Sequence, residues 1–555
     1  MKQVLIINIT RMGDLVQMGT LLARLQEEWP GAAVDLIVDR QFTPVASMLN
    51  GLRDVVAYDF HALIDESRAC VKDAVALYRE VAAWARDLHE RRYDRIINLT
   101  FNRPSALLAE YVGAPDIRGA RSAWDGGTVI DNPWMAYFTD IHQIRRINRF
   151  NLVDVYAMGG SRPGSFAPLS VTAPAESGDW ACRFLSSSDQ PHLEWIAVQA
   201  GASDVMKAWR PQHFGAALAR LSAAWTGGIL FIGSASEQET IAQVIQVYRE
   251  GGGRNAMRNA AGRTTLAQLV ALLAQCRLLL TNDTGPMHLA VGVRTPVIDL
   301  SVGHVDFQET GPYGPGHWVL QPDLDCAPCG FEQVCPHQAC KDRIPIDAVS
   351  DVMRHVLGKG PAPTVAPGFR LYRSDVDEDQ LGAFHLAAGR EDPTIAWYAA
   401  FWRRYWYERF SGRPSKRPAP AGSPPDADTA SAHAETLLPV LEGLCRRADH
   451  IVRLAGQMPV SAHTIQSLQH EQAQERERAV HAGMAAWITR PLTTTFLRDL
   501  HQDNVQGLVR MARHHADAYR RWRDETLAVS RLVSTAQRAP KRLSMMTGSP
   551  QAVIG

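Results

Sequence analysis

Side chains that can move a proton or hold a phosphate follow several short apolar runs of this chain. The first is Asp14, which comes after the run 4–9 in the turn Thr10-Arg11-Met12-Gly13-Asp14. A dinucleotide-binding turn would carry three glycines in the spacing G-x-G-x-x-G, and this turn has one. The turn therefore argues against an oxidoreductase. Two roles remain open for Asp14: a general base that deprotonates a hydroxyl, or an acid that stabilises the positive end of a helix.

A second polar turn, 281–288, has the sequence TNDTGPMH and ends another apolar run. Pro286 can begin a helix, where its missing N–H costs nothing, and amides at a helix start bind phosphate oxygens without a cation. Asp283 would repel a diphosphate unless backbone donors or sugar hydroxyls engage its carboxylate. We interpret this turn as a phosphate- and sugar-binding site, with a simple helix cap as the alternative.

A third group of polar residues follows the apolar run 195–199. Lys207 offers a counter-charge for a pyrophosphate, and Ser203 is a short hydrogen-bond donor close to it along the chain. Glu237 follows the next apolar run, where it could bind ribose hydroxyls or act as an acid at a helix start. A lone lysine is usually just solvated, so a binding role for Lys207 is indicated only if its loop faces the other two turns.

Strands and helices must alternate to bring these turns together. We expect strands at 4–9, 33–38, 55–58, 95–99, 195–199, 228–233, 277–281 and 297–300, and helices at 14–29, 71–91, 211–225, 236–248, 265–275 and from 286. This alternation predicts an α/β fold with two doubly wound, Rossmann-like halves that face each other across a cleft. Ligands in such sheets bind beyond the carboxyl ends of the strands, where the three turns lie.

Past residue 360 the pattern predicts helices without strands. Apolar residues recur every three or four positions from Leu437 to Ala455 and again from Leu497 to Trp522. These helices form either a bundle that packs on itself or a module that binds a partner or a second copy of the chain. The expected domains are two Rossmann-like halves at 1–172 and 173–360, an aromatic-rich helical segment at 361–410, a proline-rich linker at 411–430, a helical α domain at 431–540 and a disordered tail at 541–555.

The bulk properties are those of a globular protein with several domains, since 555 residues are too many for one core. The 58 basic and 58 acidic residues cancel, so no overall field favours nucleic acid or an anionic membrane surface. The first apolar run is shorter than a signal-peptide core, and no stretch reaches the roughly 18 apolar residues of a membrane helix. We therefore expect a cytoplasmic protein.

Four cysteines crowd into fifteen residues with the spacing C-x2-C-x5-C-x4-C: Cys326, Cys329, Cys335 and Cys340. In a reducing compartment such a cluster indicates a metal before a disulfide. Four thiolates can wrap one tetrahedral ion, either zinc or iron. The role would be structural, because no open coordination position is evident. Unligated thiols are the main alternative.

Three stretches together resemble the family 9 glycosyltransferases, whose type members are the ADP-heptose:lipopolysaccharide heptosyltransferases of Gram-negative bacteria. The stretches are 4–14, 207–209 and, most specifically, 282–290, which is continued by 295–296 and 311–314. The resemblance implies a GT-B fold and an inverting, metal-independent mechanism. It also implies a nucleotide-diphosphate donor such as ADP-heptose, and an acceptor that is a lipopolysaccharide core or another surface glycan.

The resemblance further implies roles for the residues above. Asp14 falls on the proposed base, in an N-terminal acceptor domain. The donor domain supplies phosphate, ribose and sugar contacts: Ser203, Lys207, Glu237, Asp283, Thr284, Gly285 and His288. Two departures matter, since Asn8 stands where the family often has lysine and Glu237 aligns only loosely with the ribose-binding glutamate. Cysteine-rich loops also occur in iron-binding protein heptosyltransferases of the family.

Other functions fit the same residues. The chain could add heptose to a protein, act as a nucleotide-sugar epimerase of the same architecture, or serve as a non-catalytic scaffold through its C-terminal helices. The presence of Asp14, Lys207, Asp283 and His288 together argues against the scaffold. No cofactor is expected for catalysis and no nucleic acid as a partner. Self-association, a protein partner and a peripheral position at the cytoplasmic face of the inner membrane stay open.

Overall fold

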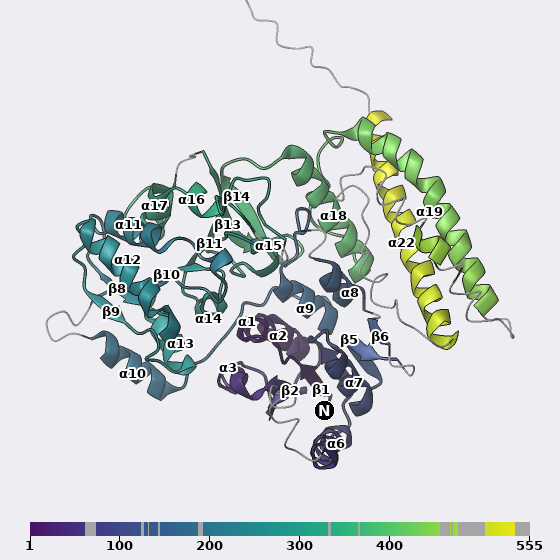
Figure 1. The fold of residues 1–555 in the computed structure, drawn as a ribbon, viewed down its shortest axis with the longest axis horizontal. Helices are drawn as coiled ribbons and strands as arrows, with labels where there is room; N and C mark the ends of the chain where they lie inside the picture. Colours follow the sequence, from purple (N-terminus) through teal and green to yellow (C-terminus); the bar gives the residue numbers. More distant parts are fainter. Residues whose placement is uncertain are drawn as a thin grey trace, which may run out of the picture. The chain divides into compact units, whose positions relative to one another are not determined.

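The computed structural model describes residues 1–60, 74–123, 127–130, 132–141, 145–186, 193–330, 335–363, 367–455, 467, 470–474 and 505–538 (Figure 1). The tail expected at 541–555 and the start of the second amphipathic pattern at Leu497 lie outside these residues. The chain divides into two compact units. The larger is Met1–Asp392 with Trp402–Pro418, and the smaller is Pro393–Phe401 with Ala419–Gly555.

A six-stranded sheet is the centre of the N-terminal half of the larger unit. Its strands are β1 (Gln3–Ile7), β2 (Ala33–Asp39), β3 (Asp54–Tyr58), β4 (Arg95–Asn98), β5 (Asp116–Ser122) and β6 (Thr128–Ile130), in the order β3-β2-β1-β4-β5-β6. All neighbours are parallel except β5 and β6. β1 lies inside the sheet because the residues from Val4 to Ile7 are all apolar, as a strand covered on both faces requires.

Helices lie on both faces of this sheet. They are α1 (Met12–Gln17), α2 (Gly19–Glu28), α3 (Thr43–Ala46), α6 (Ala74–Glu90), α7 (Arg103–Val112), α8 (Pro133–Asp140) and α9 (Leu152–Gly160), with a short 3-10 helix at Arg40–Phe42. α6 and α7 cover the face of Leu5 and Ile7. On the opposite face α9 comes so close that a Cβ at Gly160 would touch Leu21 of α2.

The helix expected at 14–29 is interrupted at Met18, so that α1 and α2 replace it. The amide of Met18 donates to the carbonyl of Val16. In an unbroken helix it would donate to the carbonyl of Asp14. That oxygen instead accepts from the side-chain amide of Asn8, at 3.2 Å. Asn8, at the end of the first apolar run, therefore fixes the short helix that carries Asp14.

An eight-stranded sheet is the centre of the C-terminal half. Its strands are β7 (Trp195–Gln199), β8 (Gly228–Phe231), β9 (Met257–Asn259), β10 (Cys276–Asn282), β11 (Val297–Leu300), β12 (Trp318–Pro322), β13 (Phe369–Val376) and β14 (Gly382–Ala388), in the order β14-β13-β12-β11-β10-β7-β8-β9. The strands from β7 to β12 run parallel. The N-terminal and C-terminal halves are thus both doubly wound α/β structures, as the sequence predicts.

The helices of the C-terminal half also cover two faces. They are α10 (Ala175–Leu185), α11 (Pro211–Leu221), α12 (Gln238–Glu250), α13 (Leu266–Ala274), α14 (Gly285–Gly292), α15 (Phe307–Thr310), α16 (Cys340–Arg343) and α17 (Ile346–Val356). α11, α12 and α17 share one apolar core with the strands. Short 3-10 helices, Val205–Lys207 and Ala235–Glu237, follow β7 and β8 at the edge where ligands bind such sheets.

The expectation of helices alone after residue 360 is wrong, because β13 and β14 extend the second sheet. β13 pairs antiparallel with β12, and β14 with β13. Arg370 and Arg373 interrupt the apolar residues of β13, as is common in strands near a sheet edge. The strand pattern in the sequence is weak for this reason, and the pairing with β12 decides the structure.

α18 (Pro393–Ser411) contributes its residues from Trp402 onward to the larger unit. Arg403 is 1% exposed and donates to Asp377, just after β13, at 2.6 Å. Its guanidinium also lies 4.3 Å from the ring centroid of Phe150, in the N-terminal half. Trp406 packs against Tyr137 of α8 with 5.1 Å between ring centroids. This part of α18 therefore fastens one half to the other.

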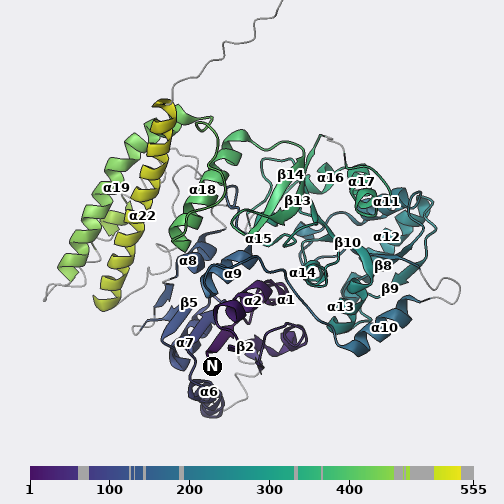
Figure 2. The same cartoon turned by 180° about the vertical axis from the view of Figure 1, so that it is seen from behind.

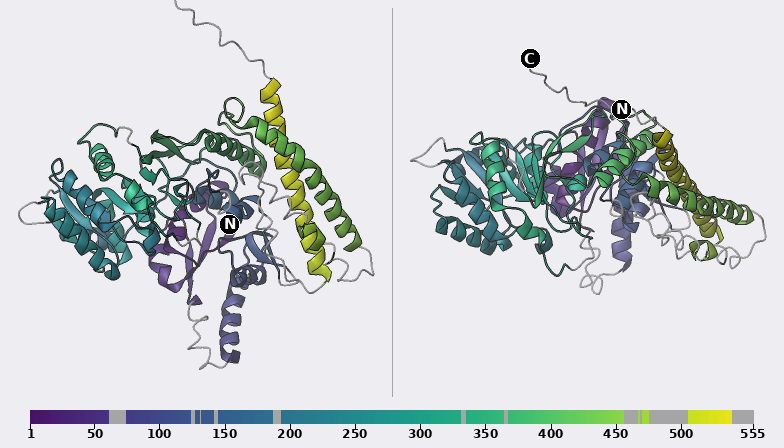
Figure 3. Two further views of the ribbon diagram at one scale, coloured as in Figure 1. Left: turned by 45° about the horizontal axis from the view of Figure 1, so that its top comes forward. Right: turned by 90° about the horizontal axis from the view of Figure 1, so that it is seen from above.

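The smaller unit contains two long helices, α19 (Ala427–Ala455) and α22 (Val505–Arg538), which lie side by side (Figure 3). They share an apolar core formed by residues of both helices: Leu437, Leu441, Leu444, Ala448, Ala516, Tyr519 and Trp522. Each helix thus covers the apolar stripe of the other. Within the described residues, no helix is both long enough and apolar enough to cross a membrane.

Candidate active site

The order of each sheet reverses beside its first strand, and ligands bind at such points. β1 lies between β2 and β4, and β7 lies between β8 and β10. Loops that leave the carboxyl ends of these strands diverge and open a crevice. Asp14 follows β1, Lys207 follows β7 and Asp283 follows β10. Three of the predicted site residues therefore stand at the reversal points of the two sheets.

The two halves meet where α1 and α14 begin (Figures 1 and 2). A Cβ added at Gly285 would lie 2.0 Å from Cε of Met12, and one added at Gly13 would lie 3.1 Å from Cδ2 of His288. A side chain at either glycine would have to displace its neighbour. The turn that carries Asp14 and the turn that carries Asp283 are therefore adjacent.

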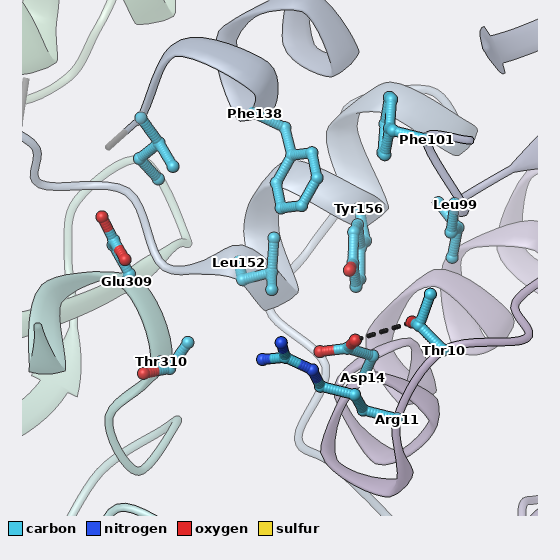
Figure 4. Close-up of a pocket in the computed structure, with 11 residues that line it drawn as sticks. Thr10, Arg11, Asp14, Leu99, Phe101, Phe138, Leu152, Tyr156, Glu309 and Thr310 are labelled. Atoms are coloured by element: carbon cyan, nitrogen blue, oxygen red, sulfur yellow. Dashed lines mark hydrogen bonds between the residues drawn. The ribbon is translucent and has the colours of Figure 1, made fainter. Parts of the chain in front are cut away.

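A cavity of about 390 Å³ opens between the halves beside this contact (Figure 4). Thr10, Arg11 and Asp14 line it from the N-terminal half, and Glu309 and Thr310 of α15 line it from the C-terminal half. The other lining residues are apolar or aromatic and lie after β4 and around α8 and α9: Leu99, Phe101, Phe138, Ile141, Leu152 and Tyr156. The cavity thus joins a polar wall to an apolar one.

Asp14 lies in the first turn of α1, where the positive end of the helix favours its charge. The hydroxyl of Thr10 donates to its Oδ2 at 2.9 Å. Burial raises the pKa of Asp14 above the ordinary value, and the Thr10 hydrogen bond and the charge of Arg11 counteract this in part. The carboxylate is consequently a stronger base than an exposed aspartate, and it faces the cavity.

Thr310 connects the cavity to the second polar turn. Its hydroxyl donates to Oδ2 of Asp283 at 2.6 Å. Burial raises the pKa of Asp283 to about 6, while the Thr310 hydrogen bond and the charge of Lys207 act in the opposite direction. The carboxylate of Asp283 is therefore held by a hydroxyl donor and by a nearby cation, which offsets the repulsion that it would otherwise exert on a phosphate.

Lys207 ends the 3-10 helix after β7, and its positive charge acts on the turn after β10. It contributes to the lowered pKa of His288, about 4, for which burial is the larger cause. It also lowers the pKa of Asp283, because a nearby cation favours the charged carboxylate. Lys207, Asp283 and His288 thus form one electrostatic group. Ser203 lies exposed in the same loop as Lys207.

Asn282 holds the loops of this group together, a role that the sequence alone does not reveal. Its side-chain amide donates to the carbonyls of Ala200 (3.0 Å) and Gly201 (3.2 Å), and its oxygen accepts from the amide of Trp209 (2.9 Å). The loop of Lys207 is therefore fixed to the end of β10. An asparagine directly before Asp283 is the only sequence signal for this role, and its partners are 73 to 82 positions away.

Thr284 and Gly285 begin α14, and Glu237 ends the 3-10 helix after β8. The hydroxyl of Thr284 donates to the carbonyl of Asn282 at 3.2 Å. The carboxylate of Glu237 accepts from the hydroxyl of Ser234 at 3.0 Å and from Nε2 of Gln199 at 3.1 Å. Glu237 is thus engaged as a helix-start acid, one of the two roles expected for it, and it lies at the carboxyl edge of the same sheet.

Asp299 of β11 is a further carboxylate that the sequence analysis missed. It is fully buried, and neither carboxyl oxygen has a hydrogen-bond partner within the described part of the chain. Burial and the neighbouring Asp283 raise its pKa well above the ordinary value, while Lys207 acts in the opposite direction. It lies inside the apolar run of a strand, where sequence patterns give no signal for a site.

Arg145, between α8 and α9, reaches from the N-terminal half into the C-terminal half. Its guanidinium donates to both oxygens of Glu309, at 2.9 and 3.0 Å, and to the carbonyls of His304 (2.8 Å) and Cys329 (3.0 Å). Glu309 lines the cavity. One buried arginine therefore connects the cavity wall with the cysteine-rich segment.

The four cysteines lie close to the loop of Lys207. Burial and the three neighbouring thiols raise the pKa of Cys329 to about 11, which shows that Cys326, Cys335 and Cys340 are near it. The amide of Cys329 donates to the carbonyl of Gly303 at 3.0 Å. All four are free thiols. In the described ranges, no group of three or more His, Cys, Asp or Glu side chains has an arrangement that could hold a metal ion.

The chain matches the profile of a known family. The profile described as "Glycosyltransferase family 9 (heptosyltransferase)" matches residues 81–340. This range includes the loops of Ser203, Lys207 and Glu237, the turn of Asp283 and the cysteine cluster up to Cys340. Asp14 lies before it.

Individual relatives are heptosyltransferases of low sequence identity. Lipopolysaccharide heptosyltransferase 2 of Escherichia coli K12 is 24% identical over 314 residues, which cover 54% of this chain and 82% of the relative. Lipooligosaccharide heptosyltransferase 2 of Campylobacter jejuni is 30% identical over 167 residues, 29% of this chain and 50% of the relative. The solved E. coli ADP-heptose lps heptosyltransferase II aligns with a TM-score of 0.46 at 22% identity, covering 64% of this chain and 98% of that one.

Proposed function

The chain belongs to glycosyltransferase family 9, and we propose that it moves a heptose from ADP-heptose to a hydroxyl of a lipopolysaccharide core or a related surface glycan. The observation that carries the proposal is the meeting of the Asp14 turn with the Asp283 turn beside one cavity. Displacement at an anomeric carbon needs a base on one side of a crevice and an anion-binding region on the other.

In the proposed reaction the acceptor oxygen bonds to the anomeric carbon while the bond from that carbon to the diphosphate oxygen breaks. The acceptor's proton passes to the carboxylate of Asp14, and the bonding electrons leave with ADP. Attack from the side opposite the leaving group inverts the anomeric centre. The raised pKa of Asp14 suits it to take this proton.

The C-terminal half stabilises the leaving group in this proposal. Lys207 and the amides at the start of α14 offset the negative charge that builds on the diphosphate. His288, with its pKa lowered to about 4, is neutral at pH 7 and adds no competing charge. The remaining donor contacts are assigned to the loops at the same edge: Ser203, Glu237, Asp283, Thr284 and Gly285. No cofactor takes part in the chemistry.

The cysteine cluster is assigned a structural role in this proposal, with zinc or iron as its candidate ion. Four thiols are a donor set that binds either metal, but no described group of three or more His, Cys, Asp or Glu side chains is placed to hold an ion. Metal analysis of the purified protein tests the assignment. Less than one equivalent of zinc or iron per chain, after purification without chelator, would remove it.

The decisive test of the proposed donor is a thermal-shift comparison of ADP-, UDP- and GDP-sugars. A ligand present at 100 times its Kd stabilises the folded state by about 2.7 kcal/mol. ADP-heptose should raise Tm most, Lys207→Ala should lose the shift, and Arg220→Ala, at an exposed ion pair, should keep it. The absence of a shift with every nucleotide sugar, together with the absence of heptosylated product by mass spectrometry, would reject the proposal.

A further inference from the structure

One side of the cavity is an aromatic wall that the proposed chemistry does not use. The rings of Phe101 and Phe138 lie 4.7 Å apart, and those of Phe138 and Tyr156 lie 5.8 Å apart. Figure 4 shows them together with Leu152 on the side of the cavity opposite Thr310. Phe101 and Phe138 are only partly buried, so their ring surfaces are available to a ligand.

The charges around the cavity are few. Of the described residues that line it, Arg11 is the single cation, and Asp14 and Glu309 are the two acids. Glu309 is already neutralised by two hydrogen bonds from Arg145. The charge of Arg11 acts on Asp14. A phosphate or carboxylate on the reacting part of an acceptor would therefore meet one cation, Arg11, whose charge the neighbouring Asp14 already offsets, so these residues give it no net attraction to balance the water that it loses.

We propose that this wall is the acceptor subsite for an uncharged pyranose ring, whose C–H face lies on Phe101 and Phe138 while a hydroxyl on the opposite edge reaches Asp14. The inference rests on the proposed function and narrows its acceptor. Aromatic faces carry partial negative charge, and the C–H face of a sugar carries partial positive charge, so the two attract. The apolar wall and the nearby carboxylate then orient the ring in one way.

The affinity for a sugar without a donor reaction tests this inference separately from the proposed function. Calorimetry on the full chain saturated with ADP should detect neutral methyl pyranosides, and the matching 6-phosphates should bind at least tenfold more weakly. Phe138→Leu keeps an apolar side chain but removes the ring face. It should weaken the binding of the neutral pyranoside by about threefold to tenfold. Phe101→Leu is a second variant with the same expectation. Tyr111→Phe, at an exposed tyrosine of α7 outside the cavity, is the matched control and should bind like the wild type.

Several results would overturn the subsite. Tighter binding of the 6-phosphates, unchanged pyranoside affinity in both phenylalanine variants, or binding of a serine- or threonine-containing peptide in place of the sugars would each do so. Donor turnover is measured separately with ADP-heptose. If turnover is absent while pyranoside binding depends on Phe138, the proposed reaction fails and the subsite stands. If turnover is normal while binding ignores Phe138, the reverse holds.

Discussion

The hydroxyl of Thr10 and the carboxylate of Asp14 make the proposed base testable through pH. Only the unprotonated carboxylate can accept a proton, so kcat/KM should fall about tenfold per pH unit below the pKa of Asp14. Because burial raises that pKa, this acidic limb should lie above the ordinary aspartate value of about 3.9. Thr10→Val removes a hydrogen bond that lowers the pKa and should move the limb to higher pH. An unmoved limb in this variant would contradict the assignment.

Lys207 is expected to act on the donor rather than on the acceptor. A hydrogen bond to a charged group contributes about 1.5–3 kcal/mol, so Lys207→Ala should weaken the donor Kd by roughly 10- to 150-fold. Lys359→Ala, at an exposed lysine after α17, is the matched control and should leave the donor Kd unchanged. The measurement is calorimetric titration with ADP. Equal affinity in wild type and Lys207→Ala would exclude Lys207 from the donor site.

Among single residues, the sequence predicts site residues that directly follow strands. It misses residues whose partners are far away along the chain. Asp14, Lys207 and Asp283 are predictable because strand ends in a doubly wound fold converge on one edge. Arg145 meets Glu309 across 164 positions, and Asn282 meets Ala200 across 82. No local pattern encodes such pairings. Asp299 is hidden for a different reason, since it lies inside an apolar strand.

The loop after β11 is an element whose geometry can be tested at Gly303. Its φ is +73°, and an added Cβ would lie 2.2 Å from the carbonyl oxygen of Met206, next to Lys207. Gly303→Ala should therefore displace the Lys207 loop, weaken ADP binding and cost about 1–3 kcal/mol of folding free energy. Gly316→Ala is the matched control, because its φ of +96° brings the same backbone strain with nothing within 4 Å. Equal ADP affinity in both variants would contradict this packing.

Among the elements, eight of the parallel strands are predicted because each contains a compact run of apolar residues. The parallel strands β5, β9 and β12 are missed, and β5 and β9 contain few apolar residues. The division of one expected helix into α1 and α2 depends on the side chain of Asn8, and β13 depends on its pairing with β12. Both features arise from contacts between segments. The amphipathic pattern predicts that the apolar stripe of α19 must be covered but leaves open what covers it, and in the structure residues of α22 do so.

In the larger unit, substitution of Arg145 tests whether its ion pair joins the two halves. Arg145 and Glu309 have side chains 8% and 7% exposed, and breaking such a buried pair costs about 3–5 kcal/mol. Arg145→Ala should lower the free energy of unfolding in urea by this amount. Arg220→Ala breaks an ion pair whose side chains are 48% and 74% exposed and should cost less than about 1 kcal/mol. Equal losses in the two variants would show that Arg145 does not join the halves.

In the proposed reaction, a base from the N-terminal half and an anion-binding site from the C-terminal half act on one pair of substrates. Single-turnover transfer from ADP-heptose, measured beside the donor Kd, tests it most directly. Asp14→Asn should keep the donor Kd and lower the transfer rate by about 100- to 10,000-fold. Transfer at the wild-type rate in this variant, or a loss of rate explained fully by weaker donor binding, would contradict the account.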